Sequence, residues 1–112
     1  MRSDAARIGD ILTAVDAAMR AAGPRSRLDV DEETLVAALT FQLIVIGEAA
    51  AAISQQGRDR WPDLPWREMI GMRNLVVHAY WSVDRDRVWR TVESDLPPLA
   101  ERLRQILHVE GD

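Results

Sequence analysis

Four polar side chains interrupt the apolar segment 71–80. They are Arg73, Asn74, His78 and Tyr80. An arginine can clamp a phosphate with paired hydrogen bonds, and an imidazole changes its charge near neutral pH. The combination of the two predicts acid–base chemistry on a phosphate ester.

The spacing of these residues places them on two neighbouring faces of a regular helix. Asn74 and His78 are one turn apart, and Arg73 and Tyr80, separated by seven residues, share a second face. Burying such groups without partners would cost several kcal/mol, so they must satisfy one another or open onto a cleft or a subunit interface. A cleft is the simplest of these arrangements.

Each residue also has a purely structural interpretation. A lone histidine in an apolar helix is more often a hydrogen-bonded structural residue than a catalyst. Asn74 alone would bond to nearby backbone, and Tyr80 alone would pack with a hydrated hydroxyl. His108, near the end of the last predicted helix, fits a favourable interaction with the helix dipole, and the four tryptophans fit core or interface positions. Only the cluster as a whole favours a site.

An acidic residue, Glu48, lies among small residues of a predicted central helix. Gly47 and the alanines at 49–52 are small enough to let another helix approach closely, from this domain or from a second subunit. A carboxylate in that setting needs a partner. Arg73 is the natural one for Glu48, although Arg73 alone could equally be paired with Asp84. We therefore expect Glu48 to support the site.

The composition indicates one globular domain spanning residues 1–112. Hydrophobic residues make up 47% and charged residues 29%, which excludes a disordered or fibrous chain. The net charge of −4 argues against a broad basic footprint, so any contact with RNA must be local. Cysteine is absent, and neither a signal peptide nor a membrane span is expected, because the longest apolar stretches are interrupted by polar residues. The cytoplasm is the expected location.

The spacing of apolar residues predicts helices along most of the chain. The first runs from Ser3 to about Ala22. The second follows a cap at Asp31, is expected to end at Gly57, and is apolar on more than one face, so it should be central. The third begins at Pro65 and carries the polar cluster.

The last third of the chain also has helical spacing. A helix should follow a cap at Asp84 and continue through Val92, after which Pro97 requires a kink or a restart, with Asp95 as a candidate cap. An apolar stripe then continues to Leu107. No pattern typical of strands is present, so the expected fold class is all-α, with four or five helices packed as a bundle.

At this point the sequence resembles a known family. Arg73, His78 and Tyr80 reproduce the Arg-x4-His-x-Tyr motif of HepT-like proteins, a branch of the HEPN superfamily. The surroundings are similar too, and the matching blocks are 46–50, 61–66, 71–74, 83–84, 88–89 and 95–97. These blocks follow one another in order between residues 46 and 97, and the resemblance predicts a single HEPN domain over residues 1–112 that dimerises through its helices.

The resemblance implies the toxin of a toxin–antitoxin pair. Such toxins are described as metal-independent ribonucleases that act as dimers on RNA, with the Arg and His of both subunits meeting in one cleft. Arg73, Asn74 and His78 would then be catalytic, with His78 taking the proton of a ribose 2′-OH and Arg73 stabilising the phosphorane. Asn74 would orient His78 or bind phosphate. Neither a metal nor a cofactor is expected, and a tRNA or an mRNA would be the substrate.

The resemblance also implies a partner and a modification. The partner is a minimal nucleotidyltransferase antitoxin of the MntA kind, which attaches AMP to the tyrosine corresponding to Tyr80 and so blocks access of RNA. A second hypothesis belongs to a different class: a non-catalytic helical binding module that docks this nucleotidyltransferase and accepts AMP. The intact motif favours the ribonuclease.

Overall fold

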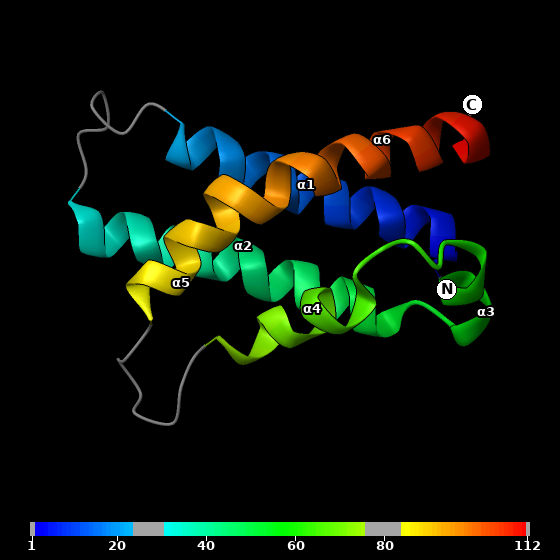
Figure 1. The fold of residues 1–112 in the computed structure, drawn as a ribbon, viewed down its shortest axis with the longest axis horizontal. Coiled ribbons are helices and arrows are strands. Elements are labelled where there is room, and N and C mark those ends of the chain that lie inside the picture. Colours follow the sequence, from blue (N-terminus) through cyan, green and yellow to red (C-terminus); the bar gives the residue numbers. More distant parts are fainter. Residues whose placement is uncertain (1, 24–30, 76–83, 112) are drawn as a thin grey trace.

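The computed structural model describes residues 2–23, 31–75 and 84–111, which are helical nearly throughout (Figure 1). The elements in chain order are α1 (Asp4–Ala22), α2 (Glu32–Ala52), α3 (Gln55–Arg60), α4 (Trp66–Gly71), the 3-10 helix η2 (Met72–Asn74), α5 (Arg85–Arg90), the π-helix η3 (Thr91–Asp95) and α6 (Leu96–Gly111). Because η2 continues α4, and η3 joins α5 to α6, these residues form five continuous helical runs. The predicted all-α fold is confirmed.

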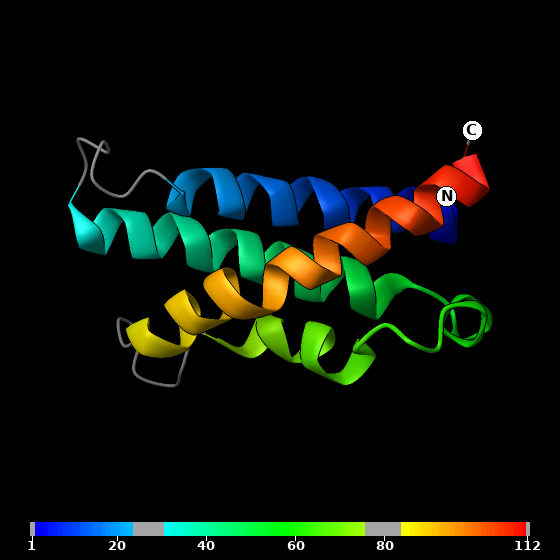
Figure 2. The ribbon, with the colours of Figure 1, turned by 45° about the horizontal axis from the view of Figure 1, so that its top comes forward.

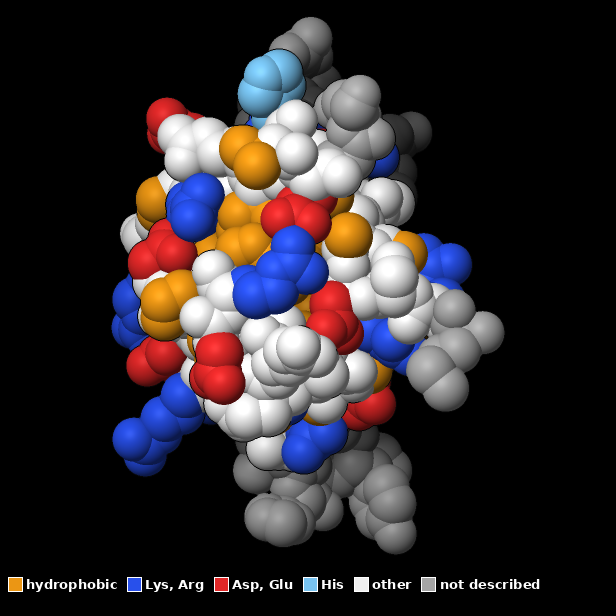
Figure 3. Space-filling model, turned by 90° about the vertical axis from the view of Figure 1, so that its right-hand side faces the viewer, with side chains coloured by type: hydrophobic (Ala, Val, Ile, Leu, Met, Phe, Trp, Pro, Cys, Tyr) orange, Lys and Arg blue, Asp and Glu red, His pale blue; other side chains and the backbone are white. Residues whose placement is uncertain are grey.

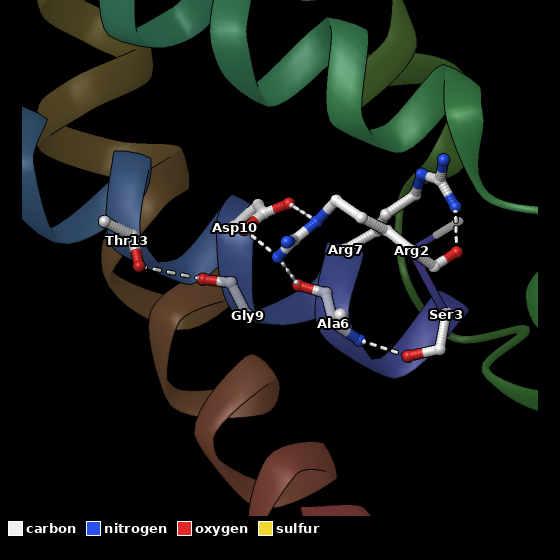
Figure 4. A network of polar contacts seen from close by, with 7 residues as sticks. All are labelled: Arg2, Ser3, Ala6, Arg7, Gly9, Asp10 and Thr13. Atoms are coloured by element: carbon white, nitrogen blue, oxygen red, sulfur yellow. Dashed lines mark hydrogen bonds and ion pairs between the residues drawn. The ribbon is translucent and has the colours of Figure 1, made fainter.

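Helices α1 and α2 form an antiparallel pair (Figure 1). The Ser3 hydroxyl accepts a hydrogen bond from the Ala6 amide at 3.0 Å and caps α1. Arg2 folds back over this first turn and pairs with Asp10 at 2.6 and 2.8 Å (Figure 4). Asp31 caps α2 by accepting from the Thr34 amide at 2.7 Å. Both helix starts agree with the sequence, since side-chain oxygens satisfy otherwise unpaired amides.

Helix α2 ends five residues before the expected position. The prediction that it runs to Gly57 is wrong: it ends at Ala52, and Gly57 lies inside α3. The cause is Ser54, whose hydroxyl accepts from the Gly57 amide at 3.0 Å and donates to Asp4 at 2.5 Å. A serine that bonds to backbone ahead of it competes with helix continuation and starts a new helix instead.

The prolines near residue 97 widen a helix without restarting it. Residues Thr91–Asp95 adopt π-helical backbone, in which the Leu96 amide donates to the Thr91 carbonyl. Pro97 has no amide to donate and its ring crowds the preceding turn, and a wider turn accommodates both effects. The expected kink or restart is therefore a π turn, and the expectation that Asp95 caps a new helix is wrong, because Asp95 lies within that turn.

Helix α2 is the centre of the fold, between α1 on one side and α4 with η2 on the other (Figure 2). Helix α6 crosses α1 and closes the core. The largest fully buried side chains include Ile8, Ile11, Leu39, Leu43, Ile46, Met69, Leu96 and Leu103. Trp61 and Trp89 are buried as well, as expected for anchors.

Helix α2 also has the length and composition of a membrane-crossing helix. The most apolar 18-residue stretch of α2 has a mean hydropathy of 1.9, and 44% of that stretch is buried within this chain. Gln42 and Glu48 interrupt the apolar residues of this helix, and the core helix of a globular protein meets the same criteria of length and composition. A central helix covered by neighbours on two sides has the same composition, because it must be apolar around most of its circumference. The part of α2 that stays uncovered is consequently an apolar surface.

Candidate functional site

Arg73 and Asn74 lie on the 3-10 turn η2, and both side chains are exposed. The single regular helix expected to carry the polar cluster is thus interrupted: α4 ends at Gly71 and the backbone tightens over Met72–Asn74. Residues three apart eclipse one another in a 3-10 helix. Met72 and Leu75 therefore both point into the core, and the two polar residues between them face solvent.

The backbone of Arg73 rests directly on Gly47 of α2. A Cβ atom built on Gly47 would lie 2.5 Å from the Arg73 amide nitrogen and 2.9 Å from the Arg73 Cβ. Only a residue without a side chain permits this approach. The prediction that Gly47 allows close packing of another helix is confirmed, and the segment that approaches it is η2 of the same chain.

Glu48 follows Gly47 on α2, and its side chain is exposed. Within the described residues it forms no ion pair with Arg73, although the two residues share the Gly47 contact region. Glu48 lines one end of a groove of about 610 Å³ between α1 and α2. Its role as a support for the site stays a prediction.

His78 and Tyr80 lie outside the residues that the structure describes. The structure thus brings the backbone and Cβ of Arg73 against Gly47, and Asn74 and Glu48 are their respective neighbours in sequence on η2 and α2. Whether the imidazole and the phenol join this group stays a prediction of the sequence. Across residues 2–23, 31–75 and 84–111 no group of three His, Cys, Asp or Glu side chains has the arrangement of a metal site.

A second cavity, which the sequence did not reveal, opens on the other side of η2. Its volume is about 360 Å³, and it lies between α4 with η2 and α5 with η3. Its basic lining residues are Arg67, Arg87 and Arg90. Arg87 and Arg90 are three apart on α5, which is a detectable signal for a shared face, but nothing in the sequence places Arg67 of α4 opposite them.

Four ion pairs join arginines to carboxylates elsewhere in the described residues. Asp63 accepts from Arg102 at 2.5 and 3.2 Å, and the guanidinium holds the pKa of that carboxyl below its usual value. Arg60 pairs with Glu110, which joins α3 to the end of α6. Acidic and basic side chains are interspersed over this end of the bundle (Figure 3). None of the arginines that line the second cavity takes part in these four ion pairs.

Comparison with known proteins gives a consistent family assignment. The profile of the family "Ribonuclease HepT-like" matches residues 10–106. "Putative RNase TTE0752" of Caldanaerobacter subterraneus subsp. tengcongensis is 31% identical over 81 residues, which are 72% of this chain and 72% of that protein. No solved structure matches the chain significantly.

Two further relatives are archaeal and match over a shorter segment. "Putative RNase MJ1380" of Methanocaldococcus jannaschii is 36% identical over 61 residues, which are 54% of this chain and 56% of the relative. "Probable ribonuclease HepT" of Thermococcus cleftensis is 39% identical over 64 residues, with 57% and 58% covered. The chain therefore spans little more than half the length of these two relatives. With the family profile extending over nearly all of its helices, the chain belongs to the HepT-like ribonuclease family.

Proposed function

We propose that this protein is the toxin of a cytoplasmic toxin–antitoxin pair and acts as a metal-independent endoribonuclease. The observation that carries the proposal is the placement of Arg73 and Asn74. Both are exposed on a turn whose backbone packs against Gly47. Their side chains can therefore contact a substrate while the backbone that carries them is held in place. A tRNA or an mRNA would supply the phosphodiester.

A composite site in a dimer would supply both an acid and a base. The motif has one histidine per chain, and general acid–base cleavage normally uses two groups. The α1–α2 groove offers a surface for the second copy: it is lined largely by Ala14, Ala17, Phe41, Ile44, Val45 and Ala49, and Phe41 is 61% exposed. An apolar surface of this kind on a central helix favours an interface.

The groove and the proposed catalytic turn are close neighbours on α2. Glu48 and Ala49 line the groove, and the residue before them, Gly47, packs against the backbone of Arg73. Gly47 and Glu48 point about 100° apart around α2. A second copy that covers the groove and extends past Glu48 would therefore approach the turn that bears Arg73. This adjacency supports a shared cleft in which each subunit contributes its own motif.

The proposed reaction is an internal transesterification. His78 removes the proton from the ribose 2′-OH, and the 2′ oxygen attacks the adjacent phosphorus. Arg73 stabilises the negative charge of the phosphorane, and the bond from phosphorus to the 5′ oxygen then breaks. His78 of the second copy donates a proton to that leaving oxygen. The products are a 2′,3′-cyclic phosphate and a free 5′-hydroxyl.

Neutralisation would act through Tyr80. A partner nucleotidyltransferase of the MntA kind would transfer AMP from ATP to the phenolic oxygen and release pyrophosphate. The added phosphodiester carries a negative charge, which repels the RNA backbone and occupies the space over the cleft. RNA would then be excluded without any change in the fold.

The test is cleavage of RNA by the purified chain in the presence of a chelator. Total RNA and a defined tRNA are incubated with the wild type, with His78→Ala and with Arg73→Ala, and the new ends are analysed for 2′,3′-cyclic phosphate. We expect cleavage by the wild type, and a loss in each variant on the order of 10²-fold or more. Absence of cleavage by a folded, unmodified dimer would refute the nuclease and favour the non-catalytic binding module.

A further inference from the structure

The cavity between α4 and α5 contains more positive than negative side chains. Three arginines line it, namely Arg67, Arg87 and Arg90, against two carboxylates, Glu68 and Asp95. Within the part of the chain that the structure describes, none of the three guanidinium groups forms an ion pair or a side-chain hydrogen bond. Among the described groups that line the cavity, positive charges therefore outnumber negative ones by three to two, in a protein whose net charge is −4.

The two sides of the cavity come from separate parts of the chain. Arg67 lies in the first turn of α4, whereas Arg87 and Arg90 share one face of α5, three residues apart. Both elements lie on the side of α2 opposite α1 (Figure 2). Guanidinium groups that converge from two helices can hold one anion from both sides, with the planar fork that suits phosphate oxygens.

The floor of the cavity is the turn that carries the proposed catalytic residues. Gly71, Met72 and Leu75 form this floor, and Arg73 and Asn74 lie between them in sequence on η2. A three-residue 3-10 turn is only about 6 Å long, since each residue rises about 2.0 Å. The cavity that the three arginines line therefore adjoins the turn against which an RNA strand at Arg73 would lie.

We propose that this cavity is a second RNA-binding subsite, which takes a phosphodiester flanking the one that is cleaved. The inference rests on the proposed function, because it assumes that RNA lies against η2. Arg67, Arg87 and Arg90 hold the flanking phosphate, and the apolar floor supports the attached ribose. The volume of about 360 Å³ is within the usual range for small-ligand sites. A protein with a net negative charge can thereby bind the anionic RNA backbone locally, through these three arginines.

The test measures binding without cleavage. The probe is a fluorescein-labelled single-stranded RNA methylated at every 2′ oxygen, which cannot undergo the proposed reaction, and binding is followed by fluorescence anisotropy from 50 to 200 mM salt. The test variant is Arg87→Gln with Arg90→Gln. The matched control is Arg20→Gln with Arg85→Gln, which has the same net charge and removes two exposed arginines that do not line the cavity.

We expect the test variant to lose about 1.4 from the slope of log affinity against log salt, because each lost phosphate contact on single-stranded nucleic acid contributes about 0.7. Over this fourfold salt range the wild type would then lose about sevenfold more affinity than the test variant. The control should keep the wild-type slope. Circular dichroism checks that all variants have the wild-type helix content.

Equal slopes in the test and control variants would overturn the subsite, as would failure of the wild type to bind the methylated RNA. A parallel titration with ATP separates a free nucleotide from RNA: a test variant that loses ATP binding but keeps the wild-type RNA slope also refutes the proposal. If the RNA slope falls as expected while native RNA is never cleaved, the subsite stands and the proposed nuclease fails.

Discussion

Replacing Gly47 by alanine would put a methyl group where the backbone of Arg73 now lies. The new Cβ would be 2.5 Å from the Arg73 amide nitrogen, whereas ordinary contacts begin at 3.4 Å. The turn η2 would have to retreat by about 0.9 Å, the difference between these two distances. Because the obstacle is backbone and not the end of a flexible side chain, the whole turn must move.

Two opposing effects decide the stability of this variant. Alanine in place of glycine stabilises a helix interior by about 1 kcal/mol, whereas overpacking of this kind costs about 1–3 kcal/mol. Gly9 in α1 provides the matched control, since a Cβ there meets nothing within 4 Å. The helix-propensity gain is common to both variants, so Gly47→Ala should be less stable than Gly9→Ala by about 1–3 kcal/mol. Urea denaturation followed by circular dichroism measures this difference.

The same displacement should reduce cleavage of RNA. A shift near 1 Å in a positioned catalytic group can cost on the order of 10²-fold in rate. Initial rates for Gly47→Ala should therefore fall by about that factor, and those for Gly9→Ala should equal the wild type. If Gly47→Ala gains as much stability as Gly9→Ala and cleaves RNA at the wild-type rate, the Gly47–Arg73 contact has no positioning role.

Three further predictions concern the interface, the pH dependence and a helix cap. Phe41→Glu should change the unfolding free energy by less than about 0.5 kcal/mol, since Phe41 is 61% exposed, but should dissociate the dimer in sedimentation velocity; a dimer that persists would exclude the α1–α2 groove as the interface. Hydrogen bonds from Ser54 lower the pKa of Asp4 below its ordinary 3.8, so their stabilisation is complete above that pH and is lost as the pH falls through the lower folded-state pKa. Asp4→Asn should therefore flatten the decline of the urea midpoint between pH 5 and pH 2, and unchanged profiles would contradict this assignment. The Asp84 carboxylate accepts from the Arg87 amide at 3.1 Å, so Asp84→Ala should cost about 1 kcal/mol in thermal or urea unfolding; Asp84→Asn should retain most of that stability, and an equal loss in both would exclude capping as the cause.

The parts of the fold that the sequence predicted are those determined by local chemistry. The caps at Asp31 and Asp84 could be identified because aspartate satisfies free helix amides where a helical pattern begins. The central position of α2 followed from its apolar content on more than one face. These features depend on a few neighbouring residues, so one sequence is sufficient to show them.

The features that the sequence did not predict depend on contacts between distant segments. Ser54 ends α2 while bonding to Asp4, 50 residues away, and Gly57 packs against the same carboxylate. The end of α2 at this position can be predicted only if Asp4 is known to lie next to Ser54 in the fold. The motif itself gave the polar residues but not the tightened turn that separates Arg73 from a regular helix, because that turn forms against Gly47.

The convergence of the three arginines shows the same limit. Arg67 and Arg87 are 20 positions apart on different helices, and each on its own is an ordinary exposed basic residue. Their meeting follows from the placement of α4 and α5 on one side of α2. A basic subsite in an acidic protein can therefore be recognised only once the topology is known.

The π turn at Thr91–Asp95 fixes the rotational phase of α5 relative to α6. Each residue of an α-helix turns the chain by about 100°, so removing one residue from the wide turn would convert it to ordinary helix and rotate α5 by roughly that angle. Arg87 and Arg90 would then point away from the cavity, although no contact of their own had been altered. The number of residues in the π turn therefore determines which face of α5 lines the cavity, and a single-residue insertion or deletion there would bring a different face of α5 toward the proposed RNA subsite.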